Sequence, residues 1–312
     1  MERNIIHAAL FGVAIGDALG VPAEFKDRET LKLNPVVDYE GYKSHDQPPG
    51  TFSDDSSLTF CLAESLVNGY DLKDVGRKFI AWYRNAYWTA RGEVFDIGMT
   101  TRRAIERLER DIRPDLAGDF EPEHNGNGSL MRIMPLLFYI RDMSIENRYA
   151  ITKEVSSITH GHIRSVIACF YYLEFSLRLL NGMDKHTAYA QTAPEVHAFI
   201  TQQGIVASEI SLFDPLLKED ITQYNIDTIP SFGYVINTLK ASMWCFMNTD
   251  SYEKAVLTAV NLGNDADTTA AVTGGLAGLY YGYEHIPEKW KDGLHRHEDI
   301  YNLCERLTAK YL

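Results

Sequence analysis

The chain has 312 residues, of which 45% are hydrophobic and 23% charged, and this composition excludes disordered, collagen-like and fibrous proteins. A chain of this length is ample for a deep core. The formal net charge of −13 argues against nonspecific nucleic-acid binding, which needs clustered Lys and Arg. An acidic chain still binds an anionic ligand where a metal supplies the positive charge.

The N-terminal residues lack the basic region, apolar run and cleavage site of a secretory signal. No stretch of the chain resembles the ~20 apolar residues of a membrane span. We therefore expect a cytoplasmic protein with no membrane partner. The four cysteines are far apart, form no Cys-x-x-Cys pair and are expected to be buried free thiols. They are Cys61, Cys169, Cys245 and Cys304.

Apolar residues recur mostly at helical spacing, as in segments 58–66 and 166–177, whereas alternating runs of Val, Ile and Thr are scarce. This pattern predicts a mostly α-helical fold. We find no repeat, linker or change of composition, so a single domain over residues 1–312 is predicted. Segments rich in Pro, Gly and Asp predict loops near residues 34–57, 111–129 and 214–232.

Two acidic clusters stand just before predicted helices. The first, Gly-Thr-Phe-Ser-Asp-Asp-Ser-Ser at 50–57, contains Asp54 and Asp55. Helix capping is the alternative explanation for it, because Ser and Asp are favoured caps and acidic groups complement the helix dipole. The second, Gly-Asn-Asp-Ala-Asp-Thr-Thr at 263–269, leads into a helix rich in Gly and Ala, which lets neighbouring backbones approach closely.

Both clusters offer hard oxygen ligands. Asp265 and Asp267, followed by Thr268, are spaced so that a loop can aim several oxygens at one point. Such ligands suit Mg²⁺ or Mn²⁺, whereas zinc would recruit His or Cys. Four carboxylates gathered in one place would repel one another unless divalent cations balanced them. Metal binding is therefore expected if the two clusters meet in the fold.

Four motifs, in this order, resemble those of the ADP-ribosylglycohydrolase family, which includes hydrolases of ADP-ribosylated dinitrogenase reductase and of ADP-ribosylarginine. They are Gly-Asp-Ala-Leu-Gly at 16–20 with Glu24-Phe25, Phe-Ser-Asp-Asp-Ser at 52–56, Asn-Gly-Ser-Leu-Met-Arg at 127–132 and Asn-Asp-Ala-Asp-Thr at 264–268. The resemblance spans nearly the whole chain. It implies a single compact all-α domain of orthogonal helices and a hydrolase that removes ADP-ribose from a modified protein side chain.

The resemblance also implies a site for two Mg²⁺ or Mn²⁺ ions. Its ligands would be Ser53, Asp54, Asp55, Asp265, Asp267 and Thr268. The family often has Thr where this chain has Ser53 and Ser56, and serine keeps the hydroxyl that binds the metal. As a hypothesis, a metal-bound water attacks the anomeric carbon while a carboxylate moves the proton. The implied catalytic residues are Glu24, on a mobile loop over the metals, with Asp55 and Asp267; Asp54 is a further candidate for the base.

Asp96 and the Asn-Gly turn give the next matches. Asp96, in Asp-Ile-Gly-Met-Thr, resembles an aspartate that arginine-directed members present to the guanidinium group, which a carboxylate binds bidentately. Its alternative is a helix cap. Asn127, Gly128 and Ser129 resemble a turn beside bound ADP-ribose, for which an ordinary Asn-Gly turn is the alternative.

Two less specific segments also resemble substrate-binding parts of the family. His160, in Thr-His-Gly-His, matches a Thr-His turn, and a structural histidine is the alternative. Gly233 and Tyr234, in Ser-Phe-Gly-Tyr-Val, match a segment beside the nucleotide. For Phe232 and Tyr234, packing in the core competes with stacking on adenine.

Two alternative functions stay open. Another metal hydrolase, such as a nucleotide phosphatase, would use the same site on a different bond. A binding or immunity protein would neutralise an ADP-ribosyltransferase toxin by forming a tight complex with it. The expected partners are an ADP-ribosylated protein, ADP-ribose and, in the immunity alternative, the transferase. The acceptor residue is not determined, although Asp96 favours arginine over serine.

Overall fold

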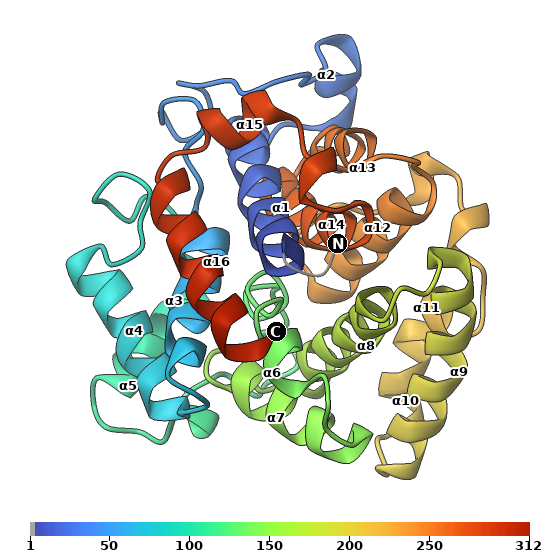
Figure 1. Ribbon diagram of the computed structural model, residues 1–312. Helices are drawn as coiled ribbons and strands as arrows, with labels where there is room; N and C mark the ends of the chain where they lie inside the picture. Colours follow the sequence, from blue (N-terminus) through green and yellow to red (C-terminus); the bar gives the residue numbers. More distant parts are fainter. Residues whose placement is uncertain (1–3) are drawn as a thin grey trace.

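The helical spacing of apolar residues gives helices along nearly the whole chain. The computed structural model describes residues 4–312, and its α-helices are labelled in Figure 1. They are α1 (Ile5–Gly20), α2 (Arg28–Leu33), α3 (Asp54–Val67), α4 (Leu72–Asn85), α5 (Met99–Leu108), α6 (Leu136–Ile140), α7 (Ile145–Ser157), α8 (Ile163–Leu180), α9 (Lys185–Gln202), α10 (Ala207–Ile210), α11 (Asp214–Leu217), α12 (Val235–Met247), α13 (Tyr252–Val260), α14 (Ala266–Tyr281), α15 (Glu288–Gly293) and α16 (His297–Tyr311).

Short 3₁₀ helices complete the secondary structure, and no strand occurs within residues 4–312. The 3₁₀ helices are η2 (Val21–Ala23), η3 (Pro114–Leu116), η4 (Ser211–Phe213), η5 (Ile221–Gln223), η6 (Ile226–Thr228) and η7 (Tyr283–His285). Two isolated bridges pair Asp119 with His160 and Gly126 with Tyr234. The all-α prediction is therefore confirmed.

Helices α1 and α14 pack together at the centre because glycines let their backbones touch. The two helices run antiparallel, with Gly12 opposite Gly274. A Cβ added at Gly16 would lie 2.1 Å from the Ala270 carbonyl oxygen, and one added at Gly274 would lie 2.1 Å from the Gly12 carbonyl oxygen. Because neither backbone can yield that much, only glycine fits at these positions. The register of the two helices is set by this contact.

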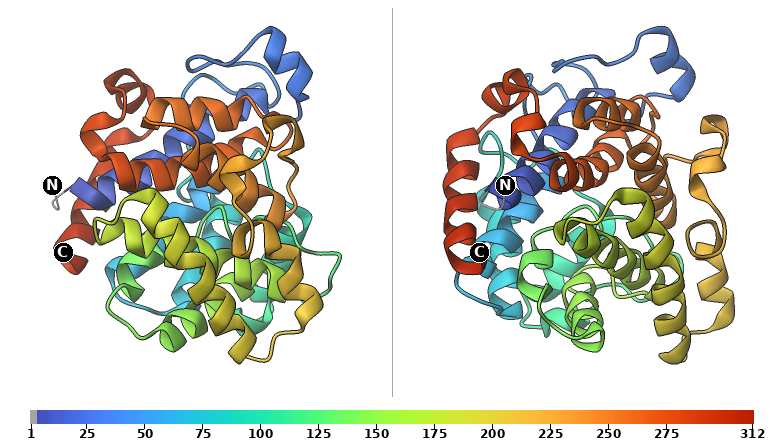
Figure 2. Two further views of the ribbon diagram at one scale, coloured as in Figure 1. Left: turned by 90° about the vertical axis from the view of Figure 1, so that its right-hand side faces the viewer. Right: turned by 45° about the vertical axis from the view of Figure 1, so that its right-hand side comes forward.

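The other helices surround this central pair in several directions (Figures 1 and 2). Helices α12 and α13 pack on α14, whereas α3 and α16 pack on α1. Helix α4 covers α3, and α7, α8 and α9 pack side by side as a second group that reaches α12 and α14 through α8. The buried apolar side chains form one continuous core. The domain is therefore a single compact unit of orthogonal helices.

Helix α1 corrects one expectation from the sequence. Residues Ile5–Ala23 form a helical span that is long and apolar enough to cross a membrane by length and composition, although no such stretch was identified in the sequence. Within its most apolar window, 94% of the residues are buried inside the protein. A helix that is apolar all round is typical of the centre of a large core. Burial within the domain therefore accounts for its composition.

The predicted loops are partly wrong. Helix α3 begins at Asp54, inside the segment 34–57, and the segment 214–232 contains α11, η5 and η6.

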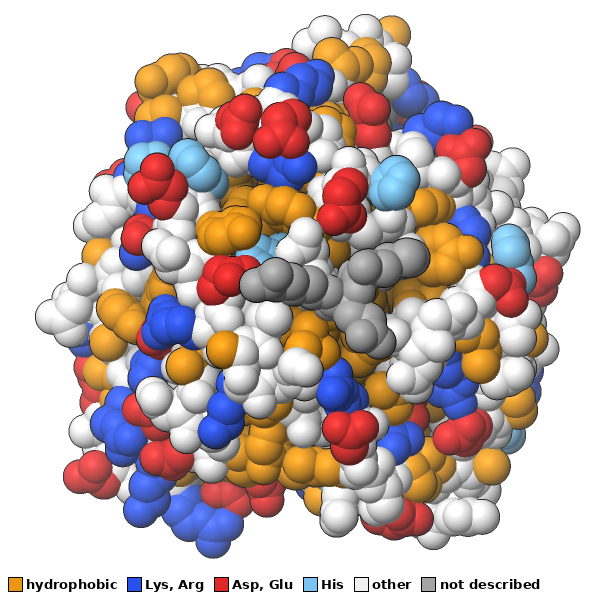
Figure 3. Space-filling view, viewed as in Figure 1, with side chains coloured by type: hydrophobic (Ala, Val, Ile, Leu, Met, Phe, Trp, Pro, Cys, Tyr) orange, Lys and Arg blue, Asp and Glu red, His pale blue; other side chains and the backbone are white. Residues whose placement is uncertain are grey.

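All four cysteines are buried and free, as expected. On the face shown in Figure 3, Lys and Arg side chains lie interspersed with Asp and Glu side chains.

Replacing Gly16 by Ala is expected to lower the free energy of unfolding by about 3 kcal/mol, because the new methyl group would collide with backbone. Gly76→Ala in α4 is the matched control, since the three atoms nearest to its Cβ belong to side chains, of Leu108 at 3.3 Å and 3.7 Å and of Pro114 at 3.7 Å, and not to backbone. Urea unfolding of both variants measures the difference. Equal stability of the two variants would contradict the central packing described here.

Candidate metal centre

The two acidic clusters meet in the fold. Thr268 Oγ1 donates to Asp55 Oδ2 at 3.3 Å, across 213 positions of sequence. Carboxylate oxygens of Asp17, Asp55 and Asp267 lie within 4.8 Å of one another, and so do oxygens of Glu24, Asp265 and Asp267. The shared Asp267 joins the two groups into one acidic centre.

The first cluster is placed by the N-terminus of α3. Ser53 caps this helix, because its Oγ accepts from the Asp55 backbone N–H at 3.3 Å. The Asp55 carboxylate in turn accepts from the Ser53 hydroxyl at 3.0 Å. Asp54 and Asp55 lie in the first turn, where carboxylates complement the helix dipole. The first cluster therefore both caps α3 and contributes carboxylates to the acidic centre, so the two explanations do not exclude each other.

Asp17 holds the first cluster in place, although the sequence analysis predicts no role for it. It is fully buried on α1, and its carboxylate accepts from the Ser53 N–H at 2.9 Å, the Ser56 N–H at 3.0 Å and the Ser56 hydroxyl at 2.5 Å. A carboxylate inside an otherwise apolar helix needs such partners. The isolated aspartate in an apolar segment is therefore the sequence feature that could have identified Asp17. Asp17 therefore ties the central helix pair to the loop that presents Asp54 and Asp55.

The second cluster is placed by the N-terminus of α14. Asp265 directly precedes the helix, and Asp267 lies in its first turn. The chain enters through Asn264, which has a φ of 59°, a left-handed conformation that asparagine tolerates. The Phe25 N–H donates to the Asn264 carbonyl oxygen at 2.6 Å. This backbone hydrogen bond holds the loop that carries Glu24 next to the N-terminus of α14.

Burial raises the pKa of every carboxylate in this centre. The pKa of Asp17 and that of Asp265 rise to about 6, and that of Glu24 rises to about 7. The pKa of Asp54, Asp55 and Asp267 rises well above the ordinary range, first through burial and then through the neighbouring carboxylates. The centre therefore cannot carry its full negative charge without protons or bound cations.

The geometry fits divalent cations. Asp55 Oδ1 is buried and has no hydrogen-bond partner among residues 4–312, so it is available as a ligand. The oxygens that converge here are carboxylates and hydroxyls, the ligands of hard cations such as Mg²⁺ and Mn²⁺. The acidic centre is therefore a candidate metal centre.

Glu24 lies in a group with His45 and Asp96. A ring nitrogen of His45 contacts the Glu24 carboxylate, and the Ser44 hydroxyl donates to the Glu24 carbonyl oxygen at 2.6 Å. Asp96 lies within 4.8 Å of both side chains. The N-cap of α5 is Gly98, so the alternative role of Asp96 as a helix cap is wrong. His45 lies in a loop without a sequence pattern, and no signal in the sequence identifies it.

The Asn-Gly turn reaches the acidic centre through Asn127. The Asn127 side-chain amide donates to Asp265 Oδ2 at 2.5 Å and to Thr238 Oγ1 at 2.8 Å. Its backbone N–H donates to the Gly233 carbonyl oxygen at 3.1 Å, and a Cβ added at Gly233 would lie 3.3 Å from Asp265 Oδ2. Asn127 and Gly233 therefore border the candidate metal centre.

The remaining predicted substrate residues differ in their exposure. The Ser129 hydroxyl is buried and lies 2.9 Å from the Ser156 hydroxyl, with which it shares a hydrogen bond, so this side chain faces the core. The buried His160 ring lies against Gly128. Tyr234 is half-buried before α12, whereas Phe232 is 61% exposed, so core packing does not describe Phe232.

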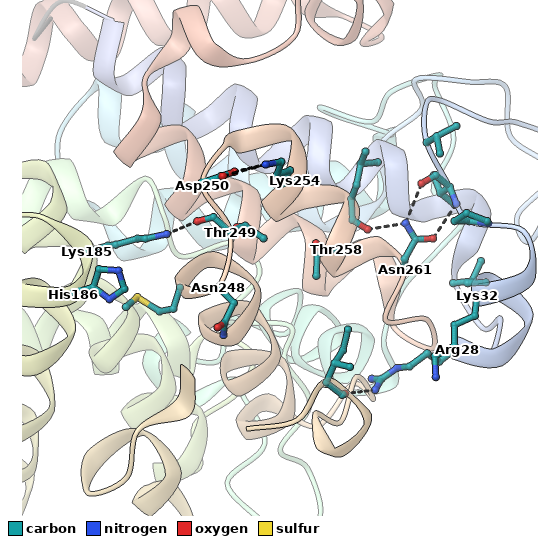
Figure 4. Close-up of a pocket in the computed structure, with 17 residues that line it drawn as sticks. Arg28, Lys32, Lys185, His186, Asn248, Thr249, Asp250, Lys254, Thr258 and Asn261 are labelled. Carbon is teal, nitrogen blue, oxygen red and sulfur yellow. Dashed lines mark hydrogen bonds and ion pairs between the residues drawn. The ribbon is translucent and has the colours of Figure 1, made fainter. Parts of the chain in front are cut away.

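A cavity of about 950 Å³ lies elsewhere, between α2, α13 and the start of α9 (Figure 4). Its cationic side chains are engaged within the protein. Lys254 pairs with Asp250 at 2.8 Å, and Lys185 donates to the Thr249 carbonyl oxygen. None of the acidic-centre residues lines this cavity. We place the candidate active site at the acidic centre, because its carboxylates can bind cations and transfer protons.

The pKa shifts predict that the metal-free protein loses stability as the pH rises. The raised pKa values mean that the folded state binds protons more tightly than the unfolded chain, whose carboxyl pKa values are about 4. The free energy of unfolding should therefore fall between about pH 4 and about pH 7. Mn²⁺ should then raise the melting temperature more at about pH 8 than at about pH 5. Thermal melts in chelator and in Mn²⁺ test this, and an equal gain at both pH values would contradict it.

Comparisons with known proteins identify the family of the chain. Residues 2–312 match the ADP-ribosylglycohydrolase family. The chain is similar to the ADP-ribosylarginine hydrolase Tri1 of Serratia proteamaculans (strain 568), at 36% identity over 96% of this chain and 77% of that protein. The Tri1 protein of Pseudomonas putida (strain GB-1) is 32% identical over 96% of this chain and 76% of its own length.

Two further relatives support the assignment. The ADP-ribosyl-dinitrogen reductase glycohydrolase of Rhodospirillum rubrum is 25% identical over 90% of this chain and 87% of that protein. A solved structure, described as an ADP-ribosylglycohydrolase-related protein complex, has a TM-score of 0.81 and 30% identity, and covers 100% of this chain and 99% of its own. The chain belongs to the ADP-ribosylglycohydrolase family, whose members are hydrolases of the N-glycosidic bonds of ADP-ribose.

Proposed function

We propose that this protein hydrolyses the bond between ADP-ribose and an arginine side chain of a modified protein, using two Mg²⁺ or Mn²⁺ ions. The observation that carries this proposal is the meeting of Asp55, Asp265 and Asp267 in one acidic centre, with Asp96 beside Glu24. The name of the Tri1 relatives, ADP-ribosylarginine hydrolase, supports arginine as the acceptor.

The proposed metal ligands are the hydroxyls and carboxylates at the starts of α3 and α14. They are Ser53, Asp54, Asp55, Asp265, Asp267 and Thr268. Cations bound there supply positive charge that holds ribose hydroxyls and lowers the pKa of a water. Asp17 would not need to bind a cation, because its carboxylate already accepts hydrogen bonds from Ser53 and Ser56.

The remaining side chains would orient the substrate and move the proton. In the reaction the bond from the anomeric carbon to the arginine nitrogen breaks, and a water oxygen bonds to that carbon. One proton of the water is removed, and one proton reaches the departing guanidine. Glu24 fits the role of base, because its carboxylate lies close to those of Asp265 and Asp267 and is also in contact with His45.

Asp96 would recognise the acceptor. Its carboxylate lies beside Glu24 and His45, and the chain continues into the exposed Met99 at the start of α5. A partly exposed carboxylate beside the centre can bind two nitrogens of a guanidinium group. Serine offers no such cation, so this contact would favour arginine.

Replacing Asp267 by Asn is expected to lower the release of ADP-ribose from an arginine-modified protein by a factor of about 10³ or more, because one shared ligand is lost. Asp250→Asn, which changes an exposed aspartate paired with Lys254, is the matched control. Chromatography of free ADP-ribose measures turnover, with a phosphate assay run beside it. Undiminished release by a folded Asp267→Asn protein, or release of phosphate in place of ADP-ribose, would refute the proposal.

Replacing Asp96 by Asn is expected to raise the KM for ADP-ribosylarginine substrates about tenfold, because the guanidinium loses a charged partner. Inhibition by free ADP-ribose, which has no guanidinium group, should change little and serves as the internal control. Steady-state kinetics measure both constants. A parallel change in KM and in ADP-ribose inhibition would place Asp96 at the nucleotide and not at the acceptor.

A further inference from the structure

Arg132, which ends the Asn-Gly-Ser-Leu-Met-Arg motif, is fully buried and has no carboxylate partner among residues 4–312. Its guanidinium lies 4.7 Å from the centre of the Phe79 ring, and its Nε and Nη1 have no hydrogen-bond partner. Its Nη2 donates to the Val155 carbonyl oxygen at 3.2 Å and to Thr159 Oγ1. A buried charge without a carboxylate partner is costly, and proteins carry such costs mainly at functional sites. We therefore infer the role of Arg132 from the groups to which it donates hydrogen bonds.

Thr159 connects Arg132 to His160. Thr159 Oγ1 lies 2.8 Å from Arg132 Nη2 and 2.8 Å from His160 Nδ1. Arginine only donates hydrogen bonds, so the threonine oxygen accepts from Arg132. Among residues 4–312, His160 Nδ1 is the only acceptor within reach of the threonine hydroxyl proton. A fully buried hydroxyl proton without an acceptor is unfavourable, so Thr159 donates to Nδ1.

We infer that Arg132 and Thr159 are positioning residues that hold His160 in the tautomer with its proton on Nε2, where it donates to an oxygen of bound ADP-ribose. A ring nitrogen that accepts a hydrogen bond carries no proton, so in a neutral imidazole the proton resides on the other nitrogen. Burial and the charge of Arg132 lower the pKa of His160 to about 3, which keeps the ring neutral.

His160 Nε2 is aimed at the turn beside the acidic centre. A Cβ added at Gly126 or at Gly128 would lie 3.4 Å from Nε2, so this nitrogen lies against the bare backbone of the turn. The residue is only 2% exposed, its Nδ1 is engaged by Thr159, and within residues 4–312 Nε2 makes no hydrogen bond; because Nε2 is not among the fully enclosed unpaired atoms, it remains open to a ligand. The ring is fixed at its base, because the His160 N–H donates to the Ser156 carbonyl oxygen at 2.8 Å.

The direction of this donor suits an oxygen ligand. The same turn contains Asn127, which binds Asp265 of the acidic centre, so a nucleotide that reaches the metals passes beside His160. An N–H at Nε2 attracts phosphate and ribose oxygens, whereas the other tautomer would present a lone pair that repels them. The identity of the ligand rests on the proposed function, but the tautomer does not.

The tautomer can be measured without turnover. In a two-dimensional spectrum of ¹⁵N-histidine-labelled protein, the His160 signal is assigned as the one absent from His160→Gln. A proton-bearing Nε2 and an unprotonated Nδ1 in the wild-type protein are expected. A proton on Nδ1 would overturn the inference, whether or not the protein hydrolyses any substrate.

Thr159→Val tests the relay, because valine keeps the shape and removes the hydroxyl. It is expected to populate the Nδ1–H form and to weaken ADP-ribose binding about tenfold in calorimetry, the loss of one directed hydrogen bond. Thr159→Ser should restore both properties. Thr152→Val is the matched control, since the buried Thr152 hydroxyl donates only to the Arg148 carbonyl oxygen of its own helix.

The same variants identify the accepting oxygen. An equal loss of affinity for ADP and for ADP-ribose would place it on the shared nucleotide, and a loss confined to ADP-ribose would place it on the distal ribose. Unchanged tautomer and affinity in a folded Thr159→Val protein would overturn the inference. If the tautomer is confirmed but arginine-linked ADP-ribose is not hydrolysed, the proposed function is refuted, whereas the roles of Arg132 and Thr159 in setting the His160 tautomer are still supported.

Discussion

The backbone contact between α1 and α14 is the constraint on which the rest of the structure depends. Because Gly12, Gly16 and Gly274 lack side chains, the two helices approach until a Cβ would overlap carbonyl oxygens of the partner. This contact places Asp17 near the first turn of α14 and so beside Asp267. A wider separation of the helices would carry the two acidic clusters apart. Packing in the core thus sets the distances between groups that do chemistry at its edge.

The charge of the centre follows from the same packing. Six carboxylates lie at this centre with raised pKa values, and the imidazole of His45 contacts one of them, that of Glu24. A folded chain tolerates this only through protons, hydrogen bonds or bound cations. Asp17 uses hydrogen bonds, whereas Asp55 keeps an oxygen without a partner. The fold therefore stores an electrostatic cost that divalent cations would relieve, which links metal binding to stability.

The fold class and the two acidic clusters could be predicted from the sequence, because helical periodicity and contiguous ligands are local properties. Roles that depend on tertiary contacts could not. Asp17 lies in an apolar helix and its partners are on α3, and His45 reaches Glu24 from a loop without a pattern. The apolar composition of residues Ile5–Ala23 is a local property that the sequence prediction missed, whereas the burial of this helix depends on the fold. The direction of the Ser129 hydroxyl, into the core, likewise depends on packing.

The most direct test of this account is the anomalous scattering of Mn²⁺ in crystals of the protein. The account predicts two peaks about 4 Å apart between the starts of α3 and α14, in contact with Asp55 and Asp267. Both peaks should weaken in Asp267→Asn crystals grown in the same way. Peaks at other positions, or full Mn²⁺ occupancy in that variant, would contradict the claim that the two clusters form one binuclear centre.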